Sequence, residues 1–465
     1  MKKQDTTTFY EYIKNKICLT CLAFFLLVLS VSAETLTYRN VLNEAVNSSF
    51  DIKISKLDVD ISKAELKVAK SELYPILSLQ FNTERNNDLS KSNSFFFAGG
   101  TVMSPYTQFR NMLYATTSYN LFDFGVTKKK VFISDRIVSQ KQIMSDLQLK
   151  DLKLKILNLY TKTLQNSEEI KIKTEILKVY EEMFKAKERL YLAGTTDKIS
   201  IMDEAVNIAR TQDDIEISKL ELRQSLEDLS SYTQKKYDAE NLEVLDFDEM
   251  NIEQNIVPVN NIVPFEMRVT EESSQIAYNP ENTPEALYYD YELEKKKAEL
   301  DIYKKQRYPA FKLYASYGLY GQDPNNYFSS YSDIAQRNLT VGILGNLALF
   351  DGFRNKANRE KAALEMEKIQ VQKEKKLREM AVEYEKTCNA YESYIKELEF
   401  KKKSLTNVKQ KLDALNRMCE NGLVGSHELL KTKADLLSQE YDLERNIYNI
   451  SSKIKEIQIL TGRDI

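Results

Sequence analysis

Two long stretches of equal length constrain this chain more than any other feature. The motif LFDFG contains Asp123 and Gly125, and it recurs as LFDG with Asp351 and Gly352, at an offset of 228 residues. In both copies a glycine, Gly194 or Gly422, follows the aspartate by 71 residues. The intervening residues contain almost no Gly or Pro and have helical periodicity, so each predicts a helix on the order of 100 Å long. Equal lengths indicate that both helices span the same fixed distance.

The first residues predict export from the cytoplasm. Lysines precede an apolar run of 15 residues from Ile17 to Val31, and the small residues Val31-Ser32-Ala33 follow it. This pattern is typical of a secretory signal peptide covering residues 1–33. A membrane anchor is the alternative, but the run is shorter than the ~20 residues that a spanning helix needs.

The sequence offers little for enzymatic chemistry. His427 is the only histidine, which excludes a histidine-rich metal site and a Ser/His/Asp triad. No Gly-rich phosphate loop is present, and a net charge of −3 gives no case for nucleic acid. Cys388 and Cys419 would lie roughly 46 Å apart on one helix, too far for an intrachain disulfide. We therefore expect no enzyme, no cofactor and no metal site, and we interpret the two thiols as helix-packing residues, with a bridge between subunits as the alternative.

Two segments change from helical periodicity to a period of two. Tyr74-Pro75 and Tyr308-Pro309 each end a helix, because proline disfavours helical geometry in the preceding residue. Strand pairs are predicted at about 74–123 and 308–351, with one apolar face. That face comprises Leu77, Leu79, Phe81, Leu113, Ala115, Tyr119, Leu121, Phe311, Leu313, Ala315, Tyr317, Leu319, Leu339, Val341, Ile343 and Leu347.

Alternation with dense aromatic residues is typical of membrane β-strands, although a half-buried sheet in a soluble domain is the alternative. An open sheet edge cannot exist in lipid, and bacterial barrels have at least about eight strands. Four strands therefore require association of several chains. The loops between the strands, at about 86–108 and 322–336, differ in length and are expected on the cell exterior.

The long helices also carry coiled-coil seams. Apolar residues in the second copy follow alternating steps of three and four, which makes helices wrap side by side. This seam comprises Tyr391, Ile395, Leu398, Leu405, Val408, Leu412 and Leu415. A cytosolic coiled-coil tether would show the same stripe, but it would lack a signal peptide and strand pairs.

These elements divide the chain into two repeats. Repeat 1 covers 34–234, with one helix from Leu36 to Ser71, the strand pair, the long helix, a tip at about 192–200 and a further helix. Repeat 2 covers 283–465 in the same order, with its tip at about 420–428. Between them, 235–282 contains scattered prolines and an acidic run, which indicates a linker or an equatorial segment.

The ordered, duplicated motifs resemble those of the TolC-type outer-membrane efflux protein family over nearly all of the chain after residue 33. This resemblance implies an α-dominated fold with transmembrane β-strands, in which long antiparallel helical hairpins form a periplasmic α-barrel. Four strands from each chain would join a 12-stranded β-barrel shared by a homotrimer in outer-membrane lipid. The trimer would bind a periplasmic adaptor (membrane fusion) protein and, through it, an inner-membrane pump.

The resemblance also assigns roles to residues. The tips, with Gly194, Gly422, Val424, Gly425 and Ser426, would meet the adaptor. Glu428 matches an acidic constriction residue of the family, whereas Lys431 replaces the next one and Asp203 occupies the equivalent position in repeat 1. Asp203 and Lys431 could form a mixed ring of ion pairs that locks the tube; solvated helix-end charges are the alternative.

The expected function is that of a passive exit duct, gated at the helix tips, which carries substrate from pump and adaptor to the cell exterior. A structural coiled-coil surface protein or an adhesin is the alternative. The exported substrate, whether drug, metal ion or protein, is not encoded in these motifs.

Overall fold

A computed structural model describes residues 34–86, 95–96, 102–103, 108–239, 242–244, 247, 280–323, 325–332, 334 and 336–462. The expected signal peptide lies outside these residues, as do most of the first strand-connecting loop and most of the segment 235–282. The described residues divide into two units. Unit 1 takes its residues from 1–52, 149–278 and 383–465, and unit 2 from 53–148 and 279–382.

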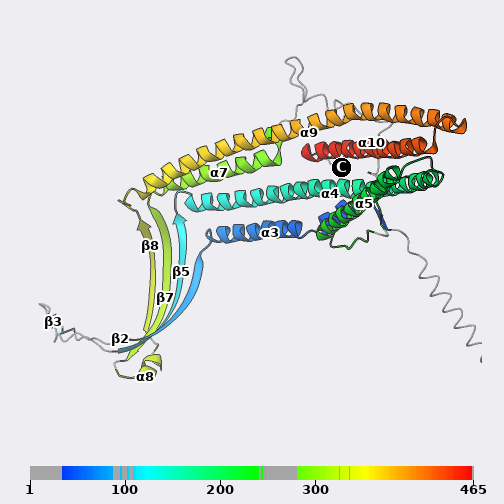
Figure 1. Cartoon of the computed structure of the whole chain (residues 1–465). Helices are drawn as coiled ribbons and strands as arrows, with labels where there is room; N and C mark the ends of the chain where they lie inside the picture. Colours follow the sequence, from blue (N-terminus) through cyan, green and yellow to red (C-terminus); the bar gives the residue numbers. More distant parts are fainter. Residues whose placement is uncertain are drawn as a thin grey trace, which may run out of the picture. The chain divides into compact units, whose positions relative to one another are not determined.

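Four helices form two long antiparallel hairpins (Figure 1). They are α4 (Val126–Leu192), α5 (Lys198–Thr233), α9 (Arg354–Glu420) and α10 (Ser426–Leu460). The helices α4 and α9 each contain 67 residues, so the two predicted long helices have the same length. Neither contains a Gly or Pro that would interrupt it.

Side-chain contacts fix the antiparallel pairing within each hairpin. In the first, Lys187 on α4 pairs with Glu204 on α5, and Thr163 bonds to Ser225. In the second, the predicted seam residues of α9 are buried or half-buried. Tyr391 and Leu398 pack there against isoleucines of α10. The three-and-four spacing thus correctly identified the buried face of α9.

Three helices of intermediate length accompany the hairpins: α2 (Tyr38–Ser48), α3 (Phe50–Ser71) and α7 (Pro284–Lys305). The structure has two helices, α2 and α3, where the sequence predicted one from Leu36 to Ser71. The chain leaves helical geometry at Ser49, whose ψ is 129° and whose backbone N–H bonds to the carbonyl of Ala45. Asn47, Ser48 and Ser49 all favour such a break, because their side chains compete for backbone hydrogen bonds.

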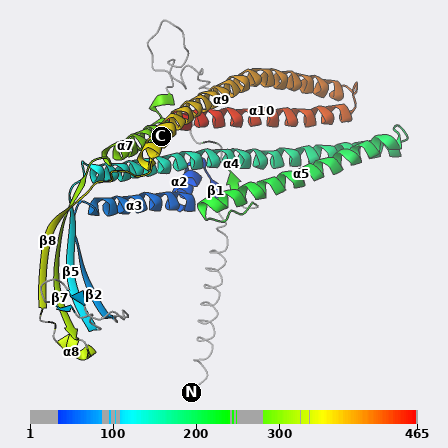
Figure 2. The same cartoon turned by 90° about the vertical axis from the view of Figure 1, so that its left-hand side faces the viewer.

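Unit 2 contains an antiparallel sheet of four strands in the order β2-β5-β7-β8 (Figure 2). The strands are β2 (Ile76–Asn86), β5 (Gln108–Phe122), β7 (Ala310–Asp323) and β8 (Gln336–Asn346). A short helix, α8 (Tyr327–Ser332), lies in the β7–β8 connection and was not predicted. Two short segments, β3 (Phe95–Phe96) and β4 (Val102–Met103), pair in the β2–β5 connection.

The strand register gives the sheet two chemically different faces. One row across the four strands is apolar: Leu79, Ala115, Tyr317 and Leu339. The adjacent row, on the other face, consists of hydroxyl residues: Ser78, Thr116, Ser316 and Thr340. The apolar face predicted from the alternation is therefore continuous across the sheet.

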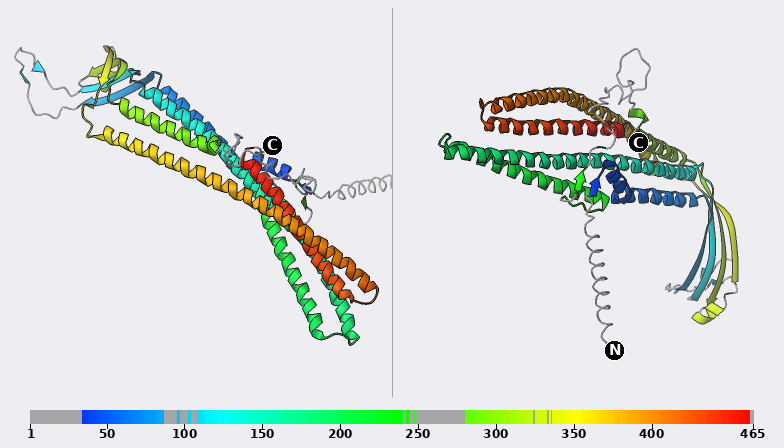
Figure 3. Two further views of the ribbon diagram at one scale, coloured as in Figure 1. Left: turned by 90° about the horizontal axis from the view of Figure 1, so that it is seen from above. Right: turned by 90° about the vertical axis from the view of Figure 1, so that its right-hand side faces the viewer.

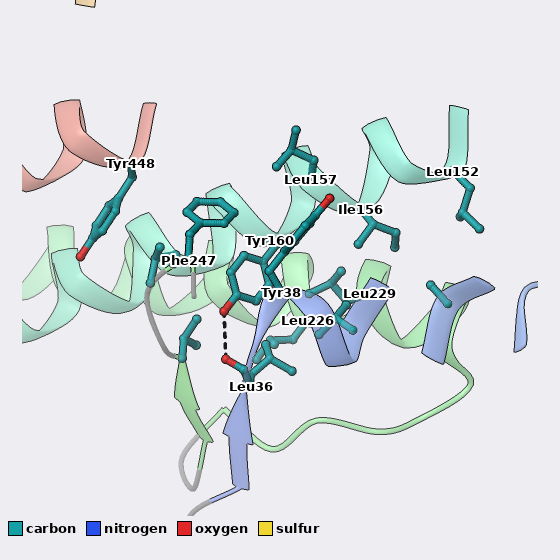
Figure 4. Packing of buried hydrophobic residues seen from close by; sticks show 14 of the residues in the cluster. Leu36, Tyr38, Leu152, Ile156, Leu157, Tyr160, Leu226, Leu229, Phe247 and Tyr448 are labelled. Atoms are coloured by element: carbon teal, nitrogen blue, oxygen red, sulfur yellow. Dashed lines mark hydrogen bonds between the residues drawn. The ribbon is translucent and has the colours of Figure 1, made fainter. Parts of the chain in front are cut away.

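The main core of unit 1 lies where α2, α4 and α5 meet (Figure 4). The rings of Tyr38, Tyr160 and Phe247 pack against one another at steep angles, with centroids 5.4–5.7 Å apart. The Tyr160 hydroxyl donates a 2.9 Å hydrogen bond to the carbonyl of Leu36 in β1 (Glu34–Leu36). This strand pairs in parallel with β6 (Leu242–Val244), so the segment after repeat 1 contributes to the core.

None of the helices among the described residues is long and apolar enough to cross a membrane. Both Cys388 and Cys419 lie on α9 as half-buried free thiols. Burial raises the pKa of the Cys388 thiol.

Candidate gate at the helix tips

Each of the two hairpins ends in a short turn (Figure 3), and the two turns share their backbone geometry. Gly194 and Gly422 adopt left-handed φ values of +73° and +68°. In each tip the glycine N–H and the next N–H bond back to the last helical turn, as in a Schellman motif. No heavy atom lies within 4 Å of where a Cβ would be on either glycine. Glycine is therefore required here by its backbone conformation and not by lack of space.

The tips differ in how the second helix of each hairpin begins. Asp197 caps α5 by accepting a 2.9 Å hydrogen bond from the backbone N–H of Ser200, and this bond lowers the pKa of Asp197. Gly425 occupies the same position before α10 and supplies no side-chain cap. Val424 is half-buried, whereas Gly425 and Ser426 are exposed. The second tip is thus the less strongly capped of the two, although glycine at an N-cap costs a helix only roughly a few tenths of a kcal/mol relative to aspartate.

A buried ion pair joins the two helices of the first hairpin next to its tip. Lys187 Nζ lies 2.7 Å from Glu204 Oε1, and the two side chains are 14% and 4% exposed. Lys187 also donates to the carbonyl of Ser200 at 3.2 Å, and Asn207 donates to the second oxygen of Glu204 at 3.2 Å. These extra bonds matter because a buried pair is tolerated only when its remaining hydrogen-bonding groups are satisfied.

His427, in the second tip, lies near this ion pair. It lies in the first turn of α10, and its Nδ1 atom is buried without a hydrogen-bond partner among the described residues. Burial, followed by the positive charge of Lys187, lowers the pKa of His427; Glu204 acts in the opposite direction. Burial and Lys187 therefore disfavour the protonated form of this imidazole, which lies between the two hairpins.

Apolar packing holds the hairpins together just behind this cluster. Val179 and Met183 of α4 pack against Ala434 of α10. Beside them, burial and then the negative charges of Asp435 and Glu204 raise the pKa of Tyr180. The tip region of unit 1 therefore contains a compact junction in which charged groups from α4, α5 and α10 lie close together.

The predicted constriction residues lie around this junction on exposed positions. Glu428 and Lys431 are exposed in the first two turns of α10, and Asp203 is exposed on α5. Within one chain, the ion pairs found among the described residues do not join Asp203 to Lys431. A ring between subunits stays a prediction.

The predicted turn motifs start the long helices in unit 2. Asp123 accepts hydrogen bonds from the backbone N–H groups of Gly125 and Thr127, at 2.9 and 2.7 Å, and from the Thr127 hydroxyl. Burial opposes ionisation, but these bonds outweigh it and lower the pKa of Asp123. Asp351 accepts similarly from the N–H of Asn355 at 2.9 Å. Both aspartates therefore cap a long helix.

In each turn two consecutive residues with positive φ follow the aspartate. They are Phe124 (55°) and Gly125 (82°) in the first turn, and Gly352 (64°) and Phe353 (64°) in the second. The order of glycine and phenylalanine is reversed, yet the backbone path is the same. Phe124 is held by stacking on Tyr308, with ring centroids 4.7 Å apart.

The Tyr-Pro motifs lie at the opposite helix-to-strand junctions. The N–H of Tyr74 bonds to the carbonyl of Ser71, and the N–H of Tyr308 bonds to that of Lys305. Pro75 and Pro309 then lead directly into β2 and β7. Both tyrosines are exposed.

Sequence reasoning missed the buried cluster of Lys187, Glu204 and His427. Its members come from three helices and from positions far apart in the chain, so no local spacing connects them. The single histidine next to the Gly422 tip was the one available signal, and we used it only to exclude metal and triad chemistry.

The comparisons with known proteins identify the family. A model described as "Outer membrane efflux protein" matches residues 41–233 and 282–463. The chain therefore belongs to the outer membrane efflux protein family, and the resemblance stated from its motifs is confirmed. No curated protein matches the sequence.

Solved channel structures share the fold at low sequence identity. The outer membrane protein VceC of Vibrio cholerae aligns with a TM-score of 0.72 and 14% identity, covering 91% of this chain and 96% of VceC. The CmeC outer membrane channel of Campylobacter jejuni gives 0.72 and 13%, covering 91% and 85%. The open state of the MtrE outer membrane channel of Neisseria gonorrhoeae gives 0.65 and 15%, covering 93% and 92%. The predicted combination of long helical hairpins with a four-stranded sheet is thus confirmed.

Proposed function

We propose that the chain is one subunit of a homotrimeric outer-membrane exit duct, which conducts substrate passively from an inner-membrane pump and a periplasmic adaptor to the cell exterior. The observation that carries this proposal is the four-stranded sheet, one face of which is apolar and exposed. Leu77, Leu79, Leu339 and Val341 are all among its exposed residues. Such a face would be costly in water but is stable in lipid, while the hydroxyl face suits an aqueous lumen.

The two edges of the sheet support assembly from several copies. Among the described strands, β2 pairs only with β5 and β8 pairs only with β7. Each edge strand has 11 residues. Strand direction alternates across the sheet, so β8 of one copy can pair antiparallel with β2 of the next. Closure is needed because unpaired backbone groups are not tolerated in lipid.

Exposed apolar stripes on the helices support the same assembly. Helix α3 buries Ile52 and Val59 on one side, yet a second apolar stripe with steps of four, three, four and seven is exposed on the other. This stripe comprises Phe50, Ile54, Leu57, Ile61 and Val68. Exposed apolar residues also recur on α9, including Leu364, Val371 and Val382. Seams of this kind pack against other helices, here those of neighbouring copies.

In this arrangement the helical hairpins stand in the periplasm and their tips bind the adaptor. Adaptor binding would open the duct by favouring a second arrangement of the tip helices, which requires different contacts in the two states. The protein would catalyse no reaction and would need no cofactor.

Substitutions at the second tip test the docking role. Proline cannot adopt the φ of +68° found at Gly422, so Gly422→Pro should distort the tip. Gly425 has open space around it, so Gly425→Trp should fold normally. We expect both variants to form trimers but to lose export, and the matched Gly425→Ala to export normally. Normal export by Gly425→Trp would refute the assignment of the tip.

A charge reversal tests the constriction role of Glu428, Lys431 and Asp203. In a narrow pore, Lys431→Glu should strengthen the binding of cations and so increase their block of single-channel current. Unchanged conductance and unchanged block in planar bilayers would show that Lys431 does not line the constriction.

A further inference from the structure

The short helix α8 buries a polar side chain and exposes its aromatic ones, the opposite of what is expected in water. Its sequence is YFSSYS, and its Ser330 is completely buried. Its aromatic residues are exposed: Phe328 by 78%, Tyr331 by 56% and Tyr327 by 38%. A helix on a water-soluble surface normally buries its aromatic side chains and exposes its serines.

Specific hydrogen bonds hold α8 in this orientation. The side-chain amide of Asn111, in β5, is fully buried and donates a 2.8 Å hydrogen bond to Ser330 Oγ. Asp323 accepts from the backbone N–H groups of Asn325 and Asn326, and Asn326 accepts from that of Phe328. The outward direction of the aromatic side chains is therefore built into the fold.

Helix α8 lies over the apolar face of the sheet, at the end where β2 connects to β5 and β7 connects to β8. Asn111 is two residues from Leu113 on β5, so the two side chains share a face. Thr83 belongs to the same face of β2, and its hydroxyl lies 3.4 Å from the Tyr327 hydroxyl. Gly321, the β7 partner of Asn111, is buried and has no side chain to obstruct α8. The aromatic residues of α8 thus continue the apolar face toward the loops.

We propose that α8 is an interfacial anchor, whose Tyr327, Phe328 and Tyr331 insert into the headgroup region of the outer leaflet of the membrane. This inference rests on the proposed function, which puts the apolar sheet face in lipid and its loop end at the cell exterior. Tyrosine suits the headgroup region because its ring is apolar and its hydroxyl can reach water. The anchor would fix the height of the sheet in the membrane.

The absence of tryptophan from the sequence permits a direct test. Three single-tryptophan variants of the full chain are reconstituted in phosphatidylcholine vesicles carrying bromine either near the headgroup or near the chain ends. Phe328→Trp reports on α8, Leu79→Trp on the middle of the apolar sheet face, and Leu423→Trp on the exposed second tip. Bromine quenches tryptophan only at short range, so the position of the quencher reports depth.

The proposal predicts that Phe328→Trp loses fluorescence mainly with bromine near the headgroup, Leu79→Trp mainly with bromine near the chain ends, and Leu423→Trp with neither. If Leu79→Trp is quenched but Phe328→Trp is not, the anchor is refuted while the proposed function stands. Blue-shifted but unquenched emission from Phe328→Trp would mean that protein, not lipid, covers α8, which also refutes it. If Leu79→Trp is unquenched, the sheet is not in lipid and both proposals fail.

Discussion

At the scale of single residues, the tip junction depends on charges that have been removed from water. Lys187 and Glu204 form a buried pair, and removing one member of such a pair typically costs about 3–5 kcal/mol because the other is left uncompensated. His427 lies beside this pair with a buried, unpartnered nitrogen. A second positive charge at this place would act against Lys187. Protonation of the histidine should therefore weaken the junction.

This arrangement predicts that the junction between the two hairpins loosens in acid. The groups acting on His427 are Lys187 from α4, Glu204 from α5, and Glu428 and Lys431 from α10. Burial and Lys187 hold its pKa in the folded tip below the ordinary value of 6.5, so an opened tip binds a proton more readily. The contribution of neutral His427 to the stability of the junction should be fully present above pH 6.5 and should be lost as the pH falls through its lowered pKa.

The measurement is single-channel conductance in planar bilayers between about pH 7.5 and pH 5.5, a range in which an ordinary histidine titrates. We expect open events to become more frequent in acid for the unmodified protein and the pH dependence to flatten in His427→Gln. An equally steep dependence in His427→Gln would mean that the response comes from carboxylates and not from this residue.

At the scale of elements, the sheet uses glycines to accommodate large rings on its hydroxyl face. A Cβ on Gly318 would lie 2.6 Å from the ring of Tyr114, and one on Gly342 would lie 2.7 Å from the ring of Tyr314. Each tyrosine thus lies flat over a glycine of the neighbouring strand. These contacts keep bulky side chains close to the sheet on the face that we propose lines the lumen.

Gly318→Val should therefore destabilise the sheet by about 1–3 kcal/mol, the usual cost of overpacking. The expected result is a lower temperature at which the folded form is lost on heating, measured by the shift in gel mobility. Gly425→Val, with no atom within 4 Å of the added carbon, is the matched control and should leave this temperature unchanged. Equal effects of the two substitutions would contradict the packing role of Tyr114.

The elements that were predictable from the sequence are those with a sustained local period. The steps of three and four around Tyr391 identified the buried seam of α9, and the alternation around Leu79 identified the apolar face of the sheet. Helix α8 was missed because six residues are too few to show a period. The break at Ser49 has a local signal in Asn47, Ser48 and Ser49, but the apolar helical period continues on both sides of it and the signal was overlooked. The cluster around Lys187 was missed because tertiary contacts determine it: Lys187 meets residues from two other helices.

At the scale of the whole molecule, the account requires that the exposed stripe of α3 becomes covered on assembly. Leu57 lies in that stripe and is 61% exposed in the single chain. Leu57→Lys would put a charge into the interface and should shift the purified protein from trimer to monomer. Lys67, exposed on the same helix but outside the stripe, provides the control as Lys67→Glu. A normal oligomer with Leu57→Lys would show that the stripe is not an interface.

The central claim, that several copies enclose a channel, is tested most directly by imaging the purified protein in lipid nanodiscs at a resolution that separates helices. The account predicts three copies around one continuous lumen, with a closed sheet in the lipid and the Gly194 and Gly422 tips at the far end. A monomer, or a helical bundle whose centre is filled by side chains, would contradict it.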